Sequence, residues 1–82
     1  MLLLSRPDCP LCEEFLEELA HEFPALAARV RTGDVDSRDD WRGQYGRRIP
    51  VLLGEDGSVW SEGHLDVAAV AARLGAAANT GV

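Results

Sequence analysis

A short apolar run that leads directly into an amphipathic helix is the feature that most constrains the fold of this chain. Residues 1–5, MLLLS, predict a buried strand, because a brief apolar run is bounded by Arg, Pro and Asp. Pro10 suits the first turn of a helix, where its missing N–H costs nothing. Apolar residues then recur on one helical face up to Pro24, as Leu11, Phe15, Leu19 and Phe23, and Cys12 and Leu16 widen that face. Together with the second strand described next, this strand and helix predict a parallel unit with a right-handed crossover.

A second strand and a second helix are expected in the middle of the chain. Residues 29–35 contain two valines and a threonine, which are typical of a strand. Ser37 is the expected N-cap of the helix, and Asp40 completes a weak form of the capping box. Gly46 suits the C-terminal cap of this helix.

A β-hairpin and a third helix are expected in the last part of the chain. Residues 49–54 predict a strand with a proline at its start, and residues 58–61 predict the return strand. The Asp56-Gly57 pair between them is a tight-turn signal. Asp66 can cap the last helix, and Gly75 is expected to end it.

The order of these elements predicts a single α/β domain. A chain of 82 residues is long enough for one small domain, which we place at residues 1–75. Residues 76–82 are expected to form a flexible C-terminal tail. A strand, helix, strand, helix, strand, strand and helix in succession predict a four-stranded mixed sheet covered by three helices.

Charge and hydropathy exclude several kinds of partner. The formal net charge is −6 and the isoelectric point is about 4.7, which argues against nucleic-acid binding. No apolar run approaches the ~20 residues of a membrane span, and MLLLS is too short for the apolar core of a signal peptide. We therefore expect no membrane partner and a cytoplasmic location, where disulfides are usually transient and catalytic.

The two cysteines, Cys9 and Cys12, are separated by two residues and are the candidate reactive groups. Cys9 lies where the first strand leads into the first helix, and free backbone N–H groups there favour an anionic sulfur. Cys12 lies one turn further on, on the same side of the helix. This position supplies a thiolate nucleophile and a neighbour that can resolve its mixed disulfide.

A structural staple and a zinc site are the alternatives for this cysteine pair. A loop this short recovers little chain entropy, roughly 2 kcal/mol, so the bond would be a weak staple. A zinc site needs four ligands, and the chain adds only His21 and His64, which are far apart. A histidine on the polar face of the first helix is more simply a surface residue.

Cys-Pro-Leu-Cys after a short strand, followed later by Ile-Pro-Val at the start of the third strand, resembles the glutaredoxin-like branch of the thioredoxin superfamily. Residues 33–53, GDVDSRDDWRGQYGRRIPVLL, resemble three successive parts of that branch: the second strand, a short helix and the segment that leads to the cis-proline. The similarity covers roughly residues 1–75. It implies a thioredoxin-like fold with strand order 2-1-3-4.

The resemblance also implies roles for individual residues. Cys9 would be the exposed nucleophile and Cys12 the resolving thiol, with Pro50 as a cis-proline packed across from them. The backbone of Ile49 would hold an extended thiol substrate such as the peptide part of glutathione. Arg6 stands where family members often carry a basic residue, and it would help to hold the thiolate or a substrate carboxylate.

The sequence departs from the usual pattern of that family at two positions around the site. Leu11 stands between the cysteines where a dithiol glutaredoxin usually has Tyr. The Gly-Gly pair that helps to bind glutathione is replaced by residues 62–66, EGHLD, in which only Gly63 and Asp66 are candidate remnants. These departures weaken the case for glutathione specificity more than the case for dithiol chemistry.

The surroundings of the cysteine pair are acidic, which is a further departure. The flanking carboxylates are those of Asp8, Glu13 and Glu14. Negative charge disfavours both a thiolate and the anionic glutathione tripeptide. Three arginines would offset this charge if they converged on the site, namely Arg6, Arg47 and Arg48. The same arginines are equally consistent with a solvated turn.

These observations favour a small dithiol–disulfide oxidoreductase, an electron carrier with a Cys9/Cys12 pair. Its expected partners are a disulfide-bearing protein or glutathione as co-substrate, and a cellular thiol that restores the pair. We expect no bound cofactor and a monomer. The alternative is a non-catalytic binding module of the same fold, because a fold does not guarantee its usual chemistry. An iron–sulfur cluster bridged between two chains is a third possibility, against which Pro10 argues.

Overall fold

The computed structural model describes residues 1–79 of the chain. Its strands are β1 (Leu2–Ser5), β2 (Arg31–Asp34), β3 (Val51–Leu53) and β4 (Val59–Glu62). Its α-helices are α1 (Pro10–Glu22), α2 (Pro24–Ala27), α3 (Asp39–Tyr45) and α4 (Val67–Asn79), with a 3₁₀ turn η1 (Val35–Ser37) before α3. No helix among these residues is both long and apolar enough to cross a membrane.

The four strands form one mixed sheet in the order β2-β1-β3-β4, as predicted. β1 pairs with β2 in parallel and with β3 in antiparallel register, and β4 completes the hairpin with β3. The two central strands are the apolar ones, because both of their faces are covered. The edge strand β2 reads RTGD, and its mostly exposed polar side chains suit an unpaired edge.

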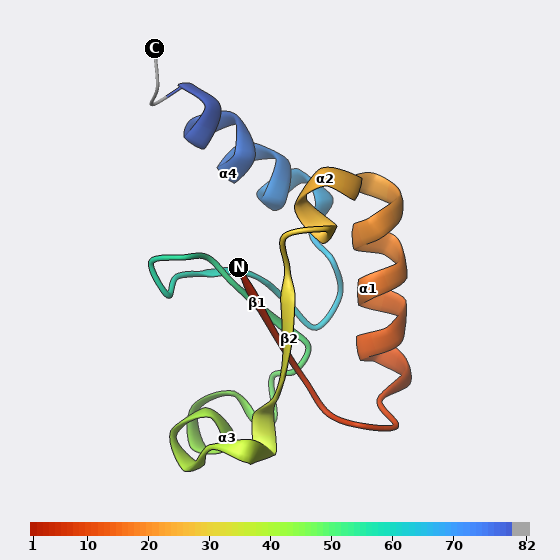
Figure 1. The fold of residues 1–82 in the computed structure, drawn as a ribbon, viewed down its shortest axis with the longest axis vertical. Coiled ribbons are helices and arrows are strands. Elements are labelled where there is room, and N and C mark those ends of the chain that lie inside the picture. The colour runs from red at the N-terminus through yellow and green to blue at the C-terminus, as the bar shows by residue number, and fades with distance from the viewer. Residues whose placement is uncertain (80–82) are drawn as a thin grey trace.

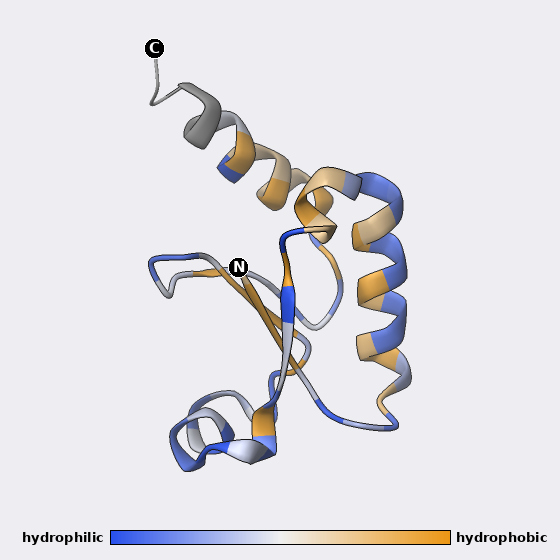
Figure 2. Cartoon of the chain, viewed as in Figure 1, coloured by the Kyte–Doolittle hydropathy of each residue, from blue (hydrophilic) through white to orange (hydrophobic). Residues whose placement is uncertain are grey.

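Two small cores lie on opposite faces of the sheet. Side chains alternate between these faces along a strand. Leu3 of β1 and Leu52 of β3 therefore pack with the buried residues of α1, α2 and α4. Their neighbours Leu4 and Val51 pack on the other face with Tyr45 of α3. Figure 1 shows α1 and α3 on opposite sides of the strands, and Figure 2 shows the apolar side of α1 turned toward them.

The helix predicted after the first strand is α1, and its buried side is the apolar face predicted from the sequence. Cys12, Phe15 and Leu19 are buried, whereas the glutamates of the helix are exposed. Pro10 occupies the first turn, as expected. The amphipathic pattern therefore fixes which side of α1 meets the sheet, and hence where its first residue and the adjoining Cys9 lie.

Three sequence predictions in the middle of the chain are wrong in detail. The described residues contain a fourth α-helix, α2, beside the three predicted, because Pro24 ends α1 and begins a new helical turn. β2 is shorter than the predicted 29–35. Arg38, not Ser37, is the N-cap of α3. Ser37 instead ends η1, where its hydroxyl donates to the carbonyl oxygen of Asp34 at 2.7 Å.

The last helix begins as predicted but does not end as predicted. Oδ1 of Asp66 accepts the backbone N–H of Ala69 at 3.0 Å, so this carboxylate caps the start of α4. Gly75 lies inside α4, which continues to Asn79. Gly75 is not among the glycines with positive φ, and glycine ends a helix chiefly by adopting that conformation. The predicted tail covers residues 76–82. Its first part, residues 76–79, continues α4, and residues 80–82 lie outside the described residues. The flexibility of this tail therefore stays a prediction.

Candidate functional site

One end of the sheet brings together the segments that carry most of the predicted site residues. β1 and β2 are parallel and end together. β3 starts at this end, because Leu4 of β1 pairs with Val51 in antiparallel register. β4 ends here as well, since Glu62 also pairs with Val51. The loop after β1, which leads to the cysteines, therefore starts at the same edge as the Ile49–Pro50 peptide and Gly63.

Cys9 and Cys12 form a disulfide at the start of α1, with their Cα atoms 5.2 Å apart. Cys9 is the N-cap residue, and its sulfur accepts the backbone N–H of Cys12 at 3.2 Å. The carbonyl oxygen of Cys9 accepts the N–H of Glu13, which is the first hydrogen bond of the helix. Cys9 is partly exposed, whereas Cys12 is only 3% exposed. The pair therefore has one accessible sulfur, held where helix amides favour negative charge, and one buried sulfur.

Asp8, immediately before Cys9, has a left-handed backbone with φ of 58°. Aspartate tolerates this conformation better than most residues with a Cβ, and it costs roughly 1–2 kcal/mol for an ordinary L-residue. The sequence identified Asp8 only as a nearby charge. Its backbone has a second role, because the turn at this residue directs the chain from β1 into α1.

Pro50 and Gly63 lie side by side at the same end of the sheet. The Ile49–Pro50 peptide bond is cis, as the resemblance implies, and Pro50 is fully buried. The carbonyl oxygen of Pro50 accepts the backbone N–H of Gly63 at 2.8 Å. Gly63 has φ of 73°, a conformation that favours glycine. Gly63 therefore extends the pairing of β4 with β3 by one bond beyond Glu62.

Asp66 and Leu11 complete the set of predicted site residues. The side chain of Asp66 is engaged in capping α4, and its backbone N–H donates to the hydroxyl of Ser61 at 3.0 Å. The same hydroxyl donates to the carbonyl oxygen of His64 at 3.1 Å. Ser61 is only 6% exposed, and no sequence signal marked it as the residue that fixes this loop. Leu11 lies between the cysteines on α1 and is half-buried.

The guanidinium group of Arg6 joins two loops at the end of the sheet where β1 and β2 end and β3 begins, which we call the site end. Its Nε and Nη2 donate to the two carboxylate oxygens of Asp36, at 2.6 and 3.0 Å. Its Nη1 also donates to the carbonyl oxygen of Gly46 at 3.3 Å. The hydrogen bonds from Arg6 hold the pKa of Asp36 below its ordinary value, and Asp36 in turn raises the pKa of Arg6. The sequence reasoning missed Asp36, because nothing local in the sequence connects residues in two separate loops.

The other two arginines are divided between an ion pair and the solvent. Nε of Arg48 donates to Oε2 of Glu62 at 2.7 Å, and its guanidinium lies 5.2 Å from the ring centre of Tyr45. Arg47 is exposed and forms no ion pair within residues 1–79. Two of the three arginines that were candidates to offset the acidic charge, Arg6 and Arg48, are thus each paired with a carboxylate.

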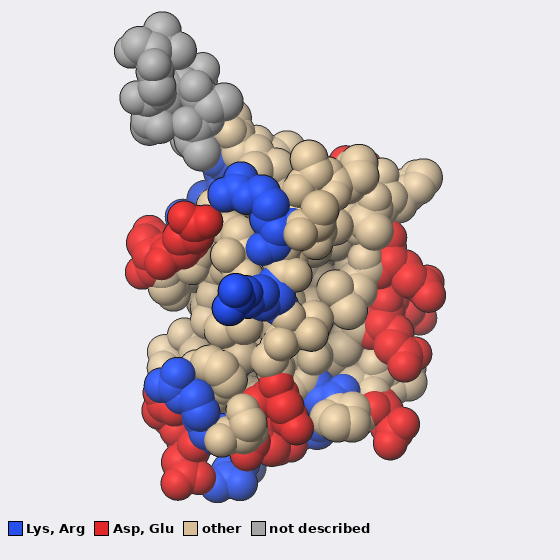
Figure 3. Space-filling view, viewed as in Figure 1, with Lys and Arg blue, Asp and Glu red and all other residues tan. Residues whose placement is uncertain are grey.

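The carboxylates around the cysteine pair have no such compensation. Asp8, Glu13 and Glu14 are exposed, and none of them forms an ion pair in the described part of the chain. Figure 3 shows one group of acidic side chains along the outer side of the molecule where α1 lies, in addition to others elsewhere on this face. The acidic surroundings predicted from the sequence are therefore present on the folded surface.

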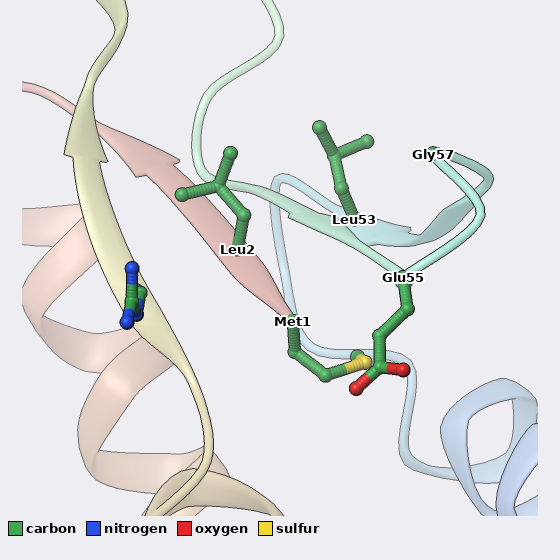
Figure 4. Close-up of a pocket in the computed structure, with 7 residues that line it drawn as sticks. Met1, Leu2, Leu53, Glu55 and Gly57 are labelled. Atoms are coloured by element: carbon green, nitrogen blue, oxygen red, sulfur yellow. The ribbon is translucent and has the colours of Figure 1, made fainter.

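A pocket lies at the opposite end of the sheet from the cysteines. It is bordered by the start of β1 and the end of β3, with Met1, Leu2, Leu53, Glu55 and Gly57 around it (Figure 4). None of the predicted site residues lines this pocket. Within residues 1–79, no group of three or more His, Cys, Asp or Glu side chains is placed to hold a metal ion.

Comparison with known proteins gives one family and one solved structure. Residues 1–75 match the family described as Glutaredoxin-like domain (DUF836). The fold is similar to that of the Northeast Structural Genomics target protein XcR50 from X. campestris, with a TM-score of 0.73 and 29% sequence identity. The match covers 92% of this chain and 95% of that one. No curated protein matches the sequence significantly. Because the family match extends over most of the chain, this protein belongs to the glutaredoxin-like domain family.

Proposed function

We propose that this protein is a small dithiol–disulfide oxidoreductase that carries electrons through Cys9 and Cys12. The observation that carries the proposal is the asymmetry of the pair. Cys9 is partly exposed at the N-cap of α1, while Cys12 is buried and within bonding distance. An accessible sulfur beside backbone amides is the better nucleophile, and a protected neighbour is suited to resolving the mixed disulfide.

The proposed exchange proceeds in two balanced steps. The Cys9 thiolate attacks one sulfur of a substrate disulfide, which forms a mixed disulfide and releases the other half as a thiolate. Cys12 then loses its proton to solvent and attacks the Cys9 sulfur, which releases the second substrate thiolate and leaves the Cys9–Cys12 disulfide. Two electrons pass from the protein to the substrate. A cellular thiol reverses the two steps on the protein and restores the pair.

The segment around Ile49 is the proposed binding surface for the substrate backbone. Ile49 precedes β3 at the site end of the sheet, and its N–H and C=O form no backbone hydrogen bond in the described part of the chain. An extended peptide next to a disulfide can pair with such free groups, as in strand addition. Pro50, Gly63 and Leu11 would border this peptide. Arg6 and Asp66 would act on a substrate only through groups that are not already engaged with Asp36 and Ala69.

The proposed partners are a disulfide-bearing protein or glutathione as co-substrate, together with a cellular thiol reductant. The chemistry needs no bound cofactor, because the two cysteines themselves hold the electrons. We place the protein in the cytoplasm, where thiols are kept reduced and a disulfide of this kind turns over. One monomer contains both cysteines and suffices for the reaction.

A redox titration in glutathione buffers tests this proposal. Free thiols at Cys9 and Cys12 are alkylated at each potential and counted by mass. A reversible internal disulfide within the cytosolic range, roughly −180 to −320 mV, is the expected result. Replacement of Cys9 with Ser should abolish disulfide reduction. Retained activity in that variant would refute the assignment of the nucleophile.

A non-catalytic binding module of the same fold is the second candidate. The missing Gly-Gly pair and the engagement of Arg6 by Asp36 favour it, because both remove groups that would bind an anionic thiol substrate. This candidate predicts that the cysteines stay reduced or fail to exchange across the whole titration. The same experiment therefore decides between the two functions.

A further inference from the structure

We infer that the Cys9 site selects disulfides by charge and reacts faster with cationic disulfides than with anionic ones, glutathione disulfide included. The inference rests on the proposed function and names its substrate class. It follows from the balance of charge near Cys9: the nearby carboxylates form no ion pair within the described residues, whereas two of the nearby arginines do.

The negative charge closest to Cys9 along the chain comes from its own loop and helix. Asp8 is the preceding residue, and its left-handed backbone forms the turn into α1. Glu13 lies one helical turn beyond Cys9, since its N–H donates to the carbonyl oxygen of Cys9 at 3.1 Å. Glu14 is next to Glu13 and is likewise exposed. All three carboxylates lack an ion pair within residues 1–79.

The positive charge that could compensate them is engaged elsewhere. Both carboxylate oxygens of Asp36 accept hydrogen bonds from Arg6, so this pair contributes little net charge to the site. Arg48 is paired in the same way with Glu62. Arg47 remains as one exposed cation before Ile49, against three uncompensated carboxylates around Cys9. The end of the molecule that a disulfide must approach is therefore net negative.

The effect on reaction rate should be measurable but sensitive to salt. Exposed charges a few ångströms apart interact weakly in water, yet several carboxylates act on the same substrate. We expect a dicationic disulfide to react about tenfold or more faster than a dianionic one of similar size at low ionic strength. At about 1 M salt the Debye length falls to about 3 Å, and most of this preference should disappear.

Single-turnover oxidation of the reduced protein measures this preference directly. The probes are cystamine, hydroxyethyl disulfide and 3,3′-dithiodipropionate, which are cationic, neutral and anionic. Each converts the two thiols to the Cys9–Cys12 disulfide and is itself reduced to two thiols, so no other reductant is needed. Rates are divided by those of 2-mercaptoethanol with the same disulfides, which removes the intrinsic reactivity of each probe. Cystamine should then exceed dithiodipropionate about tenfold.

Charge variants on α1 test whether these carboxylates cause the preference. The double variant Glu13→Gln/Glu14→Gln should reduce the cation-to-anion rate ratio severalfold. The matched control, Glu18→Gln/Glu22→Gln, removes the same charge from the same helix. Both double variants are compared with the wild type at physiological salt, where the Debye length is about 8 Å. Glu18 lies about 13 Å along the helix axis from Cys9, beyond that length. The control should leave the ratio unchanged.

The outcomes separate this inference from the proposed function. If the neutral disulfide fails to oxidise the pair, the oxidoreductase proposal fails. If the neutral disulfide reacts but the normalised rates of the charged probes are equal, or the anion is faster, the charge selection is refuted and the redox function stands. A ratio that is the same in the wild type and in Glu13→Gln/Glu14→Gln also refutes it.

Discussion

The guanidinium of Arg6 and the carboxylate of Asp36 form a two-point hydrogen-bonded pair between two loops that are distant in the sequence. Arg6 follows β1, and Asp36 lies in η1 after β2. Because β1 and β2 are parallel neighbours, the pair joins their ends. The additional bond from Arg6 to the carbonyl of Gly46 includes the end of α3 in the same contact. The pair therefore holds the start of the loop that leads to Cys9 against the end of α3, which packs on the other face of the sheet from α1.

Replacement of Asp36 with Asn should lower the free energy of unfolding at neutral pH. It should also make that free energy fall less as the pH is lowered. The pKa of Asp36 is lowered in the folded protein by the hydrogen bonds from Arg6. Its contribution is therefore fully present above the ordinary Asp pKa of about 4, and it is lost as the pH falls through the lower folded value. Urea unfolding at a series of pH values from 7 to 2.5 measures this difference.

The control for this experiment is Glu17→Gln, which removes an exposed carboxylate of α1 that forms no ion pair within the described residues. The wild type and this control should lose stability similarly on acidification. Asp36→Asn should begin less stable at pH 7 and converge with both at low pH. Parallel curves for Asp36→Asn and the wild type would show that the pair does not contribute.

At Asp8, the glycine variant should be more stable than the alanine variant, which is the reverse of the order inside a helix. Asp8 has φ of 58°, where glycine has no steric cost and alanine does. Asp8→Gly should therefore be more stable than Asp8→Ala by about 1 kcal/mol. At Glu14, inside α1, the same two substitutions should differ by about 1 kcal/mol in the opposite direction. Thermal unfolding of the four variants measures both differences, and alanine being the better residue at both positions would contradict the left-handed turn.

Replacement of Ser61 with Ala should be more costly than its small size suggests. The Ser61 hydroxyl joins the carbonyl of His64 to the N–H of Asp66, and Ser61 is almost fully buried. Its loss leaves two backbone groups without a partner, which we expect to cost about 1–3 kcal/mol. Ser37→Ala, which also removes a hydroxyl bonded to a carbonyl but at an exposed position, should cost less. Equal losses in urea unfolding would show that burial of Ser61 is unimportant.

Much of the fold could be predicted because it depends on patterns within single segments. The apolar repeat of α1, the turn at Asp56-Gly57 and the cap at Asp66 each act over a few residues, and the structure contains all three. The errors occur where two local signals compete. Ser37 and Asp34 both favour capping, and the chain uses them in η1, so α3 begins later. Gly75 can end a helix but does not require it, and α4 continues.

The candidate site could be predicted only in part, for a different reason. The cysteine pair is a local motif, so its place at the start of α1 follows from sequence. The partners of Arg6 and Arg48 depend on the pairing of β1 with β2 and of β3 with β4, and charge alone does not select Asp36 or Glu62 from fourteen acidic residues. The buried hydroxyl of Ser61 is likewise defined only by the folded loop around it.

The unequal exposure of the two cysteines predicts which single variant accumulates a mixed disulfide. Cys12→Ser keeps the accessible sulfur of Cys9 and removes the thiol that would resolve its adduct. Incubation of the reduced variant with hydroxyethyl disulfide should therefore give a stable adduct of one half-molecule on Cys9, detected by intact mass. Cys9→Ser keeps only the buried sulfur, and its adduct should form at least about tenfold more slowly.

Unfolding supplies the control for this comparison, because it removes the difference in exposure. In concentrated urea the two variants should react at similar rates, since each then carries one exposed thiol of ordinary reactivity. If Cys9→Ser instead forms its adduct as fast as Cys12→Ser in the folded protein, Cys12 is not protected by the fold. The assignment of nucleophile and resolving thiol would then lose its main support, because it rests on the burial of Cys12.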